Sequence, residues 1–439
     1  MNTVETLITT FKNKEATIAV MGLGYVGLPL AVLFAEQGMN VIGFELSMDK
    51  VCLINTGVSD IMDIPSERLK KVTSNERFVA TTDATELGDA DAIIICVPTP
   101  LTASYEPDIS YINNAVDIIR ENMTPNTLIV LESTTYPGTS RELLLDPIEK
   151  SGFTLGEDFY ICYSPERVDP GNKTYQTENT PKVVGGIGEA STNAGIALYE
   201  TVINQVVPVA STEVAEMSKL LENTFRSINI AFINEMAMLC DKMGIDIWET
   251  IEASSTKPFG FMRFNPGPGI GGHCIPLDPI YLSWKAKEAN FFSRFIELAQ
   301  ETNSQMPEYI VQKAGTALNT VKKSLNGSNI LLVGMAYKED IDDLRESPSI
   351  PIFENLVEQG ANVSFCDPLA TTFRDKDGEI HTTVDVDYEK MSEYDLVIVL
   401  TCHKAFDKEK IAKHSSLILD TKNVLPKQYK EKTICFGNK

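Results

Sequence analysis

The chain has 439 residues, of which 43% are hydrophobic and 23% charged, and its formal net charge is −23. This length predicts two or three domains, and the composition is that of a globular protein. Because phosphate backbones select an excess of Lys and Arg, the acidic charge argues against a nucleic-acid-binding protein and against one that binds anionic membranes.

The eight cysteines are scattered without a CxxC pair, and the four histidines are not spaced like metal ligands. This pattern indicates reduced thiols, with neither a disulfide framework nor a metal site. No apolar run approaches the roughly 18 residues that a membrane helix needs. The N-terminus also lacks the basic start and apolar middle of a secretory signal. We therefore expect a cytoplasmic protein without a metal.

Residues 16–47, ATIAVMGLGYVGLPLAVLFAEQGMNVIGFELS, predict a strand, a glycine turn, a helix and a second strand. Buried strands are also predicted within 89–100 and 126–138, with a helix near 109–122 between them. Strands that alternate with helices favour a parallel sheet with helices on both faces.

The same pattern recurs near the C-terminus, in residues 328–368. AEQGMNVIGFE at 35–45 resembles VEQGANVSFCD at 357–367, and DADAIIICVPTP at 89–100 is echoed by EYDLVIVLTCH at 393–403. Convergence is the alternative, because joints of helix, glycine and strand are common in α/β proteins. Two matches in the same order favour a structural repeat.

Residues 211–246 predict one helix of about 30 residues, because Ser211 or Thr212 can cap its start, no proline interrupts it and Gly244 can end it. A helix of this length often bridges two domains and pairs with its own copy. We therefore predict an α/β fold in which two Rossmann-like doubly wound domains are joined by a long central helix, and a homodimer formed through that helix.

Gly22, Gly24 and Gly27 form a GxGxxG motif between the first strand and the first helix of residues 16–47. The glycines allow a tight turn, close approach of a pyrophosphate and close helix–strand packing, and the helix N-terminus attracts phosphates. Glu45 ends the second strand, where an acidic group bonds the adenosine ribose. A carboxylate there repels a 2′-phosphate, so NAD is the expected cofactor.

The second repeat has MAYKEDIDDLRES at 335–347 in place of the glycine loop. Lys338 and Arg345 put two cations after the carboxyl end of a strand, where α/β sheets bind ligands. In so acidic a chain this favours a second anionic ligand. The alternative is a surface cluster of ion pairs with the neighbouring aspartates.

Cys274 lies in NPGPGIGGHCIPLDP at 265–279, a loop whose glycines and prolines favour a nucleophile over a buried thiol. Asp278 follows four residues later, and Glu166 lies in YSPERVDPG at 163–171. Lys219 and Asn223 lie four residues apart on the long predicted helix and share a face, although each residue taken alone is more often a solvated one. His273 is not assigned as a base, because its side chain is expected to point away from that of Cys274.

Such a set behind an NAD domain can oxidise an alcohol through an aldehyde to an acid. An aldehyde must become tetrahedral before it can lose a hydride. A thiolate achieves this by forming a thiohemiacetal, and its oxidation leaves a thioester that water hydrolyses.

Six motifs occur in order along the chain: GLGYVGLPLA, ESTTYPGT, YSPERVDPG, AEMSKLLENTFRSINIAFINE, PGPGIGGHCIPLDP and GMAYKEDIDDLRESP. Together they resemble the UDP-glucose/GDP-mannose dehydrogenase family over nearly the whole chain. The resemblance implies NAD-dependent, four-electron oxidation of a nucleotide-sugar 6-hydroxymethyl group. The implied domains are an NAD-binding domain at 1–210, a central helical domain with the cysteine loop at 211–325 and a UDP-sugar-binding domain at 326–439.

The resemblance also implies roles for individual residues. The implied catalytic residues are Cys274 as nucleophile, Lys219 and Asn223 as oxyanion and water ligands, Asp278 to orient water, Glu166 for acid–base steps and Thr134 to position the reacting oxygen. The implied cofactor contacts are Gly22, Leu23, Gly24, Tyr25, Val26, Gly27, Glu45, Lys50, Val97, Pro98, Thr99, Ser133, Thr134 and Arg345. The implied substrate contacts are Glu166, Arg167, Lys219, Asn223, Lys257, Phe264, Gly271, Leu277 and Lys338.

Within the family, the motifs are similar to the branch that acts on UDP-N-acetylhexosamines. KPFGF at 257–261 is most similar to the UDP-N-acetylglucosamine 6-dehydrogenases, and Leu277 stands where the glucose enzymes carry Lys. Lys422 stands in DTKN where the family often has Arg, which weakens any phosphate contact there. UDP-N-acetylglucosamine is the expected substrate. The mannosamine epimer stays open, as does a catalytically silent regulator that binds NAD and a nucleotide sugar.

Overall fold

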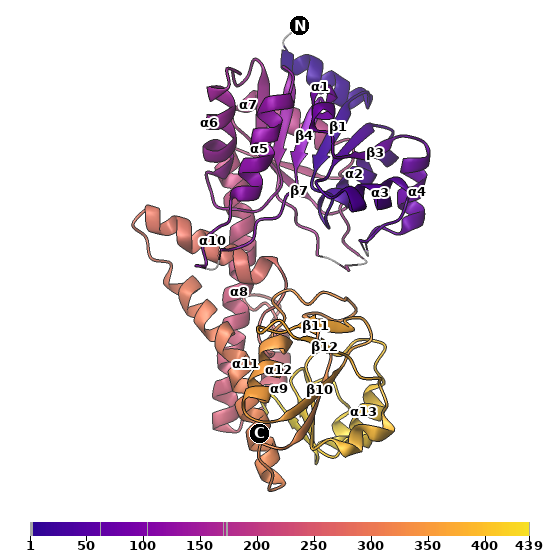
Figure 1. Cartoon of the computed structure of the whole chain (residues 1–439). Coiled ribbons are helices and arrows are strands. Elements are labelled where there is room, and N and C mark those ends of the chain that lie inside the picture. Colours follow the sequence, from indigo (N-terminus) through magenta and orange to yellow (C-terminus); the bar gives the residue numbers. More distant parts are fainter. Residues whose placement is uncertain (1–2, 62, 103, 170, 173, 439) are drawn as a thin grey trace. The chain divides into compact units, whose positions relative to one another are not determined.

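The computed structural model describes every residue except 1–2, 62, 103, 170, 173 and 439. The chain forms two compact units, one of Met1–Glu222 with Ile280–Ala289 and one of Asn223–Pro279 with Asn290–Lys439. Figure 1 labels many of the elements of both units. Within the described residues, no helix combines the length and the apolarity needed to cross a bilayer.

An eight-stranded sheet runs through the first unit in the order β3-β2-β1-β4-β5-β6-β7-β8. Its first six strands pair in parallel and have the order of dinucleotide-binding folds, whereas β7 is antiparallel to β6. The strands are β1 (Thr17–Met21), β2 (Asn40–Phe44), β3 (Phe78–Thr81), β4 (Ala92–Ile95), β5 (Thr127–Leu131), β6 (Phe159–Tyr163), β7 (Lys182–Gly186) and β8 (Val206–Val209).

Helices cover both faces of this sheet. Side chains alternate along a strand, so Ile18 and Val20 of β1 join a core with α1, α2 and α7, whereas Ala19 and Met21 join a core with α5 and α6. The helical segments are α1 (Thr3–Asn13), α2 (Gly27–Glu36), α3 (Met48–Asn55), α4 (Ser66–Ser74), η1 (Ala84–Asp89), α5 (Ser110–Asn122), η2 (Ser140–Leu145), α6 (Asp146–Lys150) and α7 (Glu189–Tyr199).

The long helix is confirmed. α8 (Thr212–Met243) is a single helix of 32 residues that begins in the first unit and continues in the second. Gly244 follows it with φ of +70°, a left-handed conformation that ends helices and that glycine adopts without strain.

The second unit contains a five-stranded parallel sheet in the order β10-β9-β13-β14-β15 and a two-stranded hairpin, β11-β12. Ile330 and Leu332 of β9 face one core, and Leu331 and Val333 face another, so helices again cover both faces. The strands are β9 (Asn329–Val333), β10 (Asn362–Cys366), β11 (Thr372–Arg374), β12 (Ile380–Thr382), β13 (Leu396–Val399), β14 (Ile418–Asp420) and β15 (Thr433–Cys435). The helical segments are α9 (Ile247–Ser255), α10 (Cys274–Glu288, shared with the first unit), α11 (Arg294–Thr320), α12 (Ser349–Glu358), η3 (Glu389–Glu393), α13 (Lys408–His414) and η4 (Lys427–Tyr429).

The two units repeat the same turn after their first strand. Gly22 has φ of +87°, and a Cβ there would lie 2.8 Å from the carbonyl oxygen of Cys96. Gly334 has φ of +83°, and a Cβ there would lie 1.9 Å from the carbonyl oxygen of Thr401. Both oxygens lie just beyond the neighbouring parallel strand. The predicted fold of two doubly wound units joined by a long helix is therefore confirmed, and one glycine of the first motif persists in the second.

We expect Gly334→Ala to lower the thermal midpoint of unfolding by several degrees more than Gly244→Ala. Both glycines are left-handed, and an alanine costs roughly 1–2 kcal/mol for that conformation. Only the new methyl group at position 334 meets a backbone oxygen, because a Cβ at Gly244 has no atom within 4 Å. Equal midpoints, measured by circular dichroism, would show that the second turn tolerates a side chain.

Candidate functional site

The glycine loop of the first unit has one glycine that packing does not require. A Cβ on Gly27 would lie 1.9 Å from the carbonyl oxygen of Gly22, so helix packing requires a glycine there. A Cβ on Gly24 would have no atom within 4 Å. The space beside Gly24 lies at the start of α2, where a helix N-terminus favours an anion. The loop therefore fits the pyrophosphate of a dinucleotide.

The other expected cofactor residues follow β2, β4 and β5, which end at the same edge of the sheet. Glu45 accepts hydrogen bonds from the amides of Leu23, at 3.3 Å, and Leu46, at 2.8 Å, so its carboxylate lies against the glycine loop. Ser133 donates to the carbonyl oxygen of Val97 at 2.7 Å, and thereby joins two of the loops. Thirteen of the fourteen expected cofactor residues belong to the first unit: Gly22, Leu23, Gly24, Tyr25, Val26, Gly27, Glu45, Lys50, Val97, Pro98, Thr99, Ser133 and Thr134.

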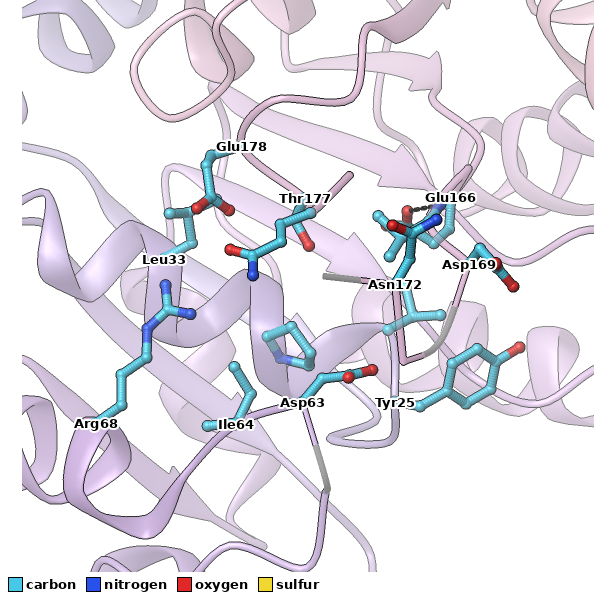
Figure 2. A pocket seen from close by; sticks show the side chains of 14 residues that line it. Tyr25, Leu33, Asp63, Ile64, Arg68, Glu166, Asp169, Asn172, Thr177 and Glu178 are labelled. Carbon is cyan, nitrogen blue, oxygen red and sulfur yellow. Dashed lines mark hydrogen bonds between the residues drawn. The ribbon is translucent and has the colours of Figure 1, made fainter. Parts of the chain in front are cut away.

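A hollow of about 590 Å³, part of it open to solvent, lies beside this loop. Tyr25 and Val26 of the GxGxxG motif line it together with Glu166, Val168 and Asp169 of the YSPERVDPG segment. Figure 2 shows Tyr25, Glu166 and Asp169 around this space. The structure thus brings a predicted catalytic carboxylate to the predicted cofactor loop, although the two segments lie far apart in the sequence.

Hydrogen bonds fix the side chains of both Glu166 and Arg167. One carboxylate oxygen of Glu166 accepts from the amides of Arg167 and Val168, each at 2.7 Å. The guanidinium of Arg167 forms two hydrogen bonds to Glu222 of α8, at 2.6 and 3.2 Å, and a third to the carbonyl oxygen of Pro181. A bidentate pair of this kind fixes the loop that carries Glu166.

Sequence reasoning missed two buried carboxylates of the first unit. Glu216 of α8 accepts from the amides of Gly138 and Ser140, at 2.6 and 2.8 Å, and holds the TYPG turn. Burial raises the pKa of Glu216, although these hydrogen bonds lower it. Glu132, directly after β5, pairs with Lys182 at 3.0 Å. For Glu132 and Lys182 the signal in the sequence was a charged residue at the end or the start of an apolar strand, whereas Glu216 lies on α8 and had no such signal.

In the second unit, Cys274 is the first residue of α10, where the sequence predicted a loop. Asp278 lies one helical turn further on, is 2% exposed, and accepts a hydrogen bond of 2.5 Å from the side-chain amide of Asn223. The partial positive charge of a helix N-terminus stabilises a thiolate. The structure therefore brings together three of the expected catalytic residues.

The glycine-rich stretch before Cys274 is fixed by packing. The amide of Gly267 donates to the side-chain oxygen of buried Asn234 at 2.9 Å. A Cβ on Gly271 or Gly272 would lie 2.4 or 2.9 Å from the side chain of Tyr337, in the MAYKED segment. Contact with Tyr337 therefore leaves no room for a side chain at either glycine, and Gly271 stays a predicted substrate contact.

The remaining expected residues fall on both units. Lys219 is buried on α8 in the first unit, and Lys257, Phe264, Gly271, Leu277, Lys338 and Arg345 lie in the second. Arg345 forms an ion pair of 2.6 Å with Asp343, as the alternative interpretation of this segment expected. Lys422 lies beside Gly267, and burial lowers the pKa of this lysine.

The second repeat replaces the glycine loop by a turn that its own side chains hold. Asp367, after β10, accepts from the amides of Met335 and Ala336, at 2.7 and 3.2 Å, and lies 3.0 Å from Nε2 of His403. Although burial raises it, hydrogen bonds from His403 and the backbone bring the pKa of Asp367 down to about 2. An ionised carboxylate here occupies the amides that a phosphate would need.

One group of potential metal ligands occurs among the described residues, formed by Asp375, Glu379 and His381 around the β11-β12 hairpin. Asp375 already accepts from the amides of Asp377 and Glu379 and lies 2.7 Å from Nε2 of His381. The hairpin itself accounts for this cluster.

The chain matches one protein family along most of its length. Residues 16–203 match the NAD binding domain of the UDP-glucose/GDP-mannose dehydrogenase family, residues 213–305 its central domain and residues 331–427 its UDP binding domain. The helix α1 lies before the first match.

Curated relatives carry two substrate names. A UDP-N-acetyl-D-mannosamine dehydrogenase of Methanococcus vannielii is 35% identical over 426 residues, which cover 94% of each chain. A UDP-N-acetyl-D-glucosamine 6-dehydrogenase of Pseudomonas aeruginosa is 32% identical and covers 94% of this chain and 98% of that protein. The solved structure of a UDP-D-ManNAc dehydrogenase from Pyrococcus horikoshii is similar with a TM-score of 0.87 and 32% identity, over 96% of this chain and 99% of that one.

Proposed function

This chain belongs to the UDP-glucose/GDP-mannose dehydrogenase family, and from that premise we propose that it oxidises C6 of a UDP-N-acetylhexosamine to a carboxylate. Its cofactor is NAD, because residues 16–203 are the NAD binding domain of the family. The observation that carries the proposal is the buried hydrogen bond between Asn223 and Asp278, one helical turn from Cys274.

The reaction removes four electrons in two steps, and an NAD held by the glycine loop would supply the hydride acceptor for each, a fresh one for the second step. The alcohol first becomes an aldehyde. The thiolate of Cys274 then adds to the aldehyde carbon, and oxidation of this thiohemiacetal gives a thioester. Water attacks the thioester, the C–S bond breaks, and the carboxylate and the thiolate are released.

The chain's own residues supply charge and orientation. The ammonium of Lys219 and the amide of Asn223 stabilise the oxyanion of the tetrahedral states. Asp278 orients the hydrolytic water, and Asn223 holds its carboxylate at 2.5 Å. Glu166 serves the proton transfers, and Thr134 positions the reacting oxygen.

We propose UDP-N-acetylglucosamine as the substrate, because KPFGF at 257–261 is most similar to the enzymes for this sugar and Leu277 replaces the Lys of the glucose enzymes. UDP-N-acetylmannosamine is the second candidate. It is favoured by the relatives of that name, which reach 35% identity against 32% for the glucosamine enzyme of Pseudomonas aeruginosa. A cytoplasmic location is proposed from the eight cysteines, all described and all unbridged.

We also propose a homodimer formed through α8. Exposed apolar side chains recur along this helix at intervals of three, four and seven residues, which places them on one face. They are Val214, Met217, Leu221, Phe225, Phe232, Leu239 and Met243. A helix of 32 residues is about 48 Å long, so its stripe offers a long self-complementary surface to a second copy.

The substrate is tested by NADH formation with UDP-N-acetylglucosamine, UDP-N-acetylmannosamine, UDP-N-acetylgalactosamine, UDP-glucose and GDP-mannose. We expect the highest kcat/KM with UDP-N-acetylglucosamine and two NADH per sugar. A preference for UDP-glucose would reject the N-acetylhexosamine branch. No NADH with any of the five would instead favour the silent regulator.

Cys274→Ser is expected to reduce uronate formation at least about 1,000-fold, because the hydroxyl of serine is a far poorer nucleophile at neutral pH. The product is followed by mass spectrometry. Cys52→Ser, which changes an exposed thiol of α3, is the matched control and should keep the parent rate. Full turnover to the uronate in Cys274→Ser would rule out the thioester mechanism.

Phe232→Asp is expected to convert the dimer to a monomer, since it places a charge in the apolar stripe of α8. Sedimentation equilibrium measures the mass. Val357→Asp, at an exposed apolar position of α12, controls for surface charge and should stay dimeric. A monomeric parent protein, or a dimeric Phe232→Asp, would place the interface elsewhere or remove it.

A further inference from the structure

Behind the loop of Glu166, the first unit buries a group of charged side chains that the reaction above does not use. Lys182, the first residue of β7, is 4% exposed, and its Nζ lies 3.0 Å from Oε2 of Glu132. The other oxygen of Glu132 accepts a hydrogen bond from the hydroxyl of Tyr199, at the end of α7. Nζ of Lys182 also lies 3.9 Å from Oε2 of Glu166. One ammonium therefore lies between two carboxylates.

Only one of these two carboxylates reaches solvent. The side chain of Glu166 is 16% exposed and lines the hollow of Figure 2, whereas that of Glu132 is fully buried. Backbone amides hold one oxygen of Glu166. Its second oxygen is the one that lies near Lys182. Glu166 is thus the residue that both contacts the buried charged group and lines the hollow.

Burial determines which members of the group carry charge. Burial alone would lower the pKa of Lys182, but Glu132 and Glu166 raise it, and the ammonium stays charged. Burial raises the pKa of Glu132 more than Lys182 lowers it. Burial also raises the pKa of Cys96 and of Tyr199, so both stay neutral. The other charged groups around Glu166 are Asp63, Arg68, Asp169 and Glu178 on the hollow, and Arg167 with Glu222.

We propose that Lys182 is a positioning residue that holds the second oxygen of Glu166 and directs it at the hollow, and that Glu132 and Tyr199 fix the ammonium of Lys182. This inference rests on the acid–base role proposed for Glu166. Lys182 touches neither substrate nor cofactor in this account and acts through Glu166. A purely structural ion pair would need only Glu132. Lys182 has a further neighbour, because its Nζ also lies 3.9 Å from Oε2 of Glu166, which lines the open hollow. This second contact indicates a role in the reaction.

The test removes the ammonium together with its buried partner, in the double variant Lys182→Met/Glu132→Gln. No unpaired charge is then left in the core, so the fold is expected to persist. The double variant removes a cation that lies 3.9 Å from a carboxylate oxygen, and such a cation favours the charged form of a carboxylate. We expect the acidic limb of the pH profile of kcat/KM to move up by about one pH unit. Lys182→Arg keeps the positive charge and should keep the limb of the parent protein.

A direct readout comes from difference infrared spectroscopy, in which the carboxylate band of Glu166 is identified by its loss in Glu166→Gln. This band should titrate at higher pH in the double variant. Glu132→Gln alone keeps Lys182 and removes the competing carboxylate, so both the band and the limb should move to lower pH. This single variant decides the inference if the double variant does not fold.

The matched control is another triad of lysine, carboxylate and tyrosine, in the second unit, where Asp241 pairs with Lys313 at 3.0 Å and accepts from the hydroxyl of Tyr309 at 2.9 Å. Lys313→Met/Asp241→Asn should keep the parent pH profile. An unmoved limb and an unmoved infrared band in the Lys182 variants would overturn the role of Lys182. An unmoved profile in Glu166→Gln would overturn the acid–base role of Glu166 instead, and the infrared titration would still test Lys182.

Discussion

Parallel pairing of strands is the constraint on which both halves of this protein depend. Parallel strands end at one edge of a sheet, so the segments after β1, β2, β4, β5 and β6 are delivered to the same edge of the first unit. This is why residues as distant in sequence as Tyr25 and Glu166 line one hollow. The second unit uses the same pairing for β9, β10, β13 and β14, with different loops.

The two units hold the turn after their first strand in the same way. In each, an acidic residue after the second strand accepts a hydrogen bond from the turn after the first, Glu45 from Leu23 and Asp367 from Met335. In the first unit the turn keeps Gly24 and open space beside it. In the second, Asp367 and His403 fill the corresponding turn with their own hydrogen bonds. The repeat is thus one architecture with the dinucleotide loop retained once.

The doubly wound fold and α8 could be predicted from the sequence. Buried parallel strands are recognisable as short apolar runs, and the long helical pattern ends at Gly244. The start of α10 at Cys274 could not be predicted, because Pro276 and Pro279 follow and proline usually argues against a helix. Lys182 was missed because its partners, Glu132 and Glu166, come from other loops. Such contacts exist only after the sheet has formed.

The contact of Tyr337 with Gly271 and Gly272 makes substitutions in two motifs of the second unit depend on each other. An added Cβ at Gly272 would lie 2.9 Å from the ring of Tyr337, so a side chain there demands a smaller residue at position 337. At Gly271 the added Cβ would meet Cβ of Tyr337 at 2.4 Å and the backbone oxygen of Glu346 at 2.9 Å, which a smaller side chain at 337 does not remove. Diversification of this loop, in nature or in a library, must therefore couple Gly272 to position 337 and leave Gly271 unchanged. Leu277, on α10, is not among the residues of this contact, so the predicted substrate residue can change without a partner at 337.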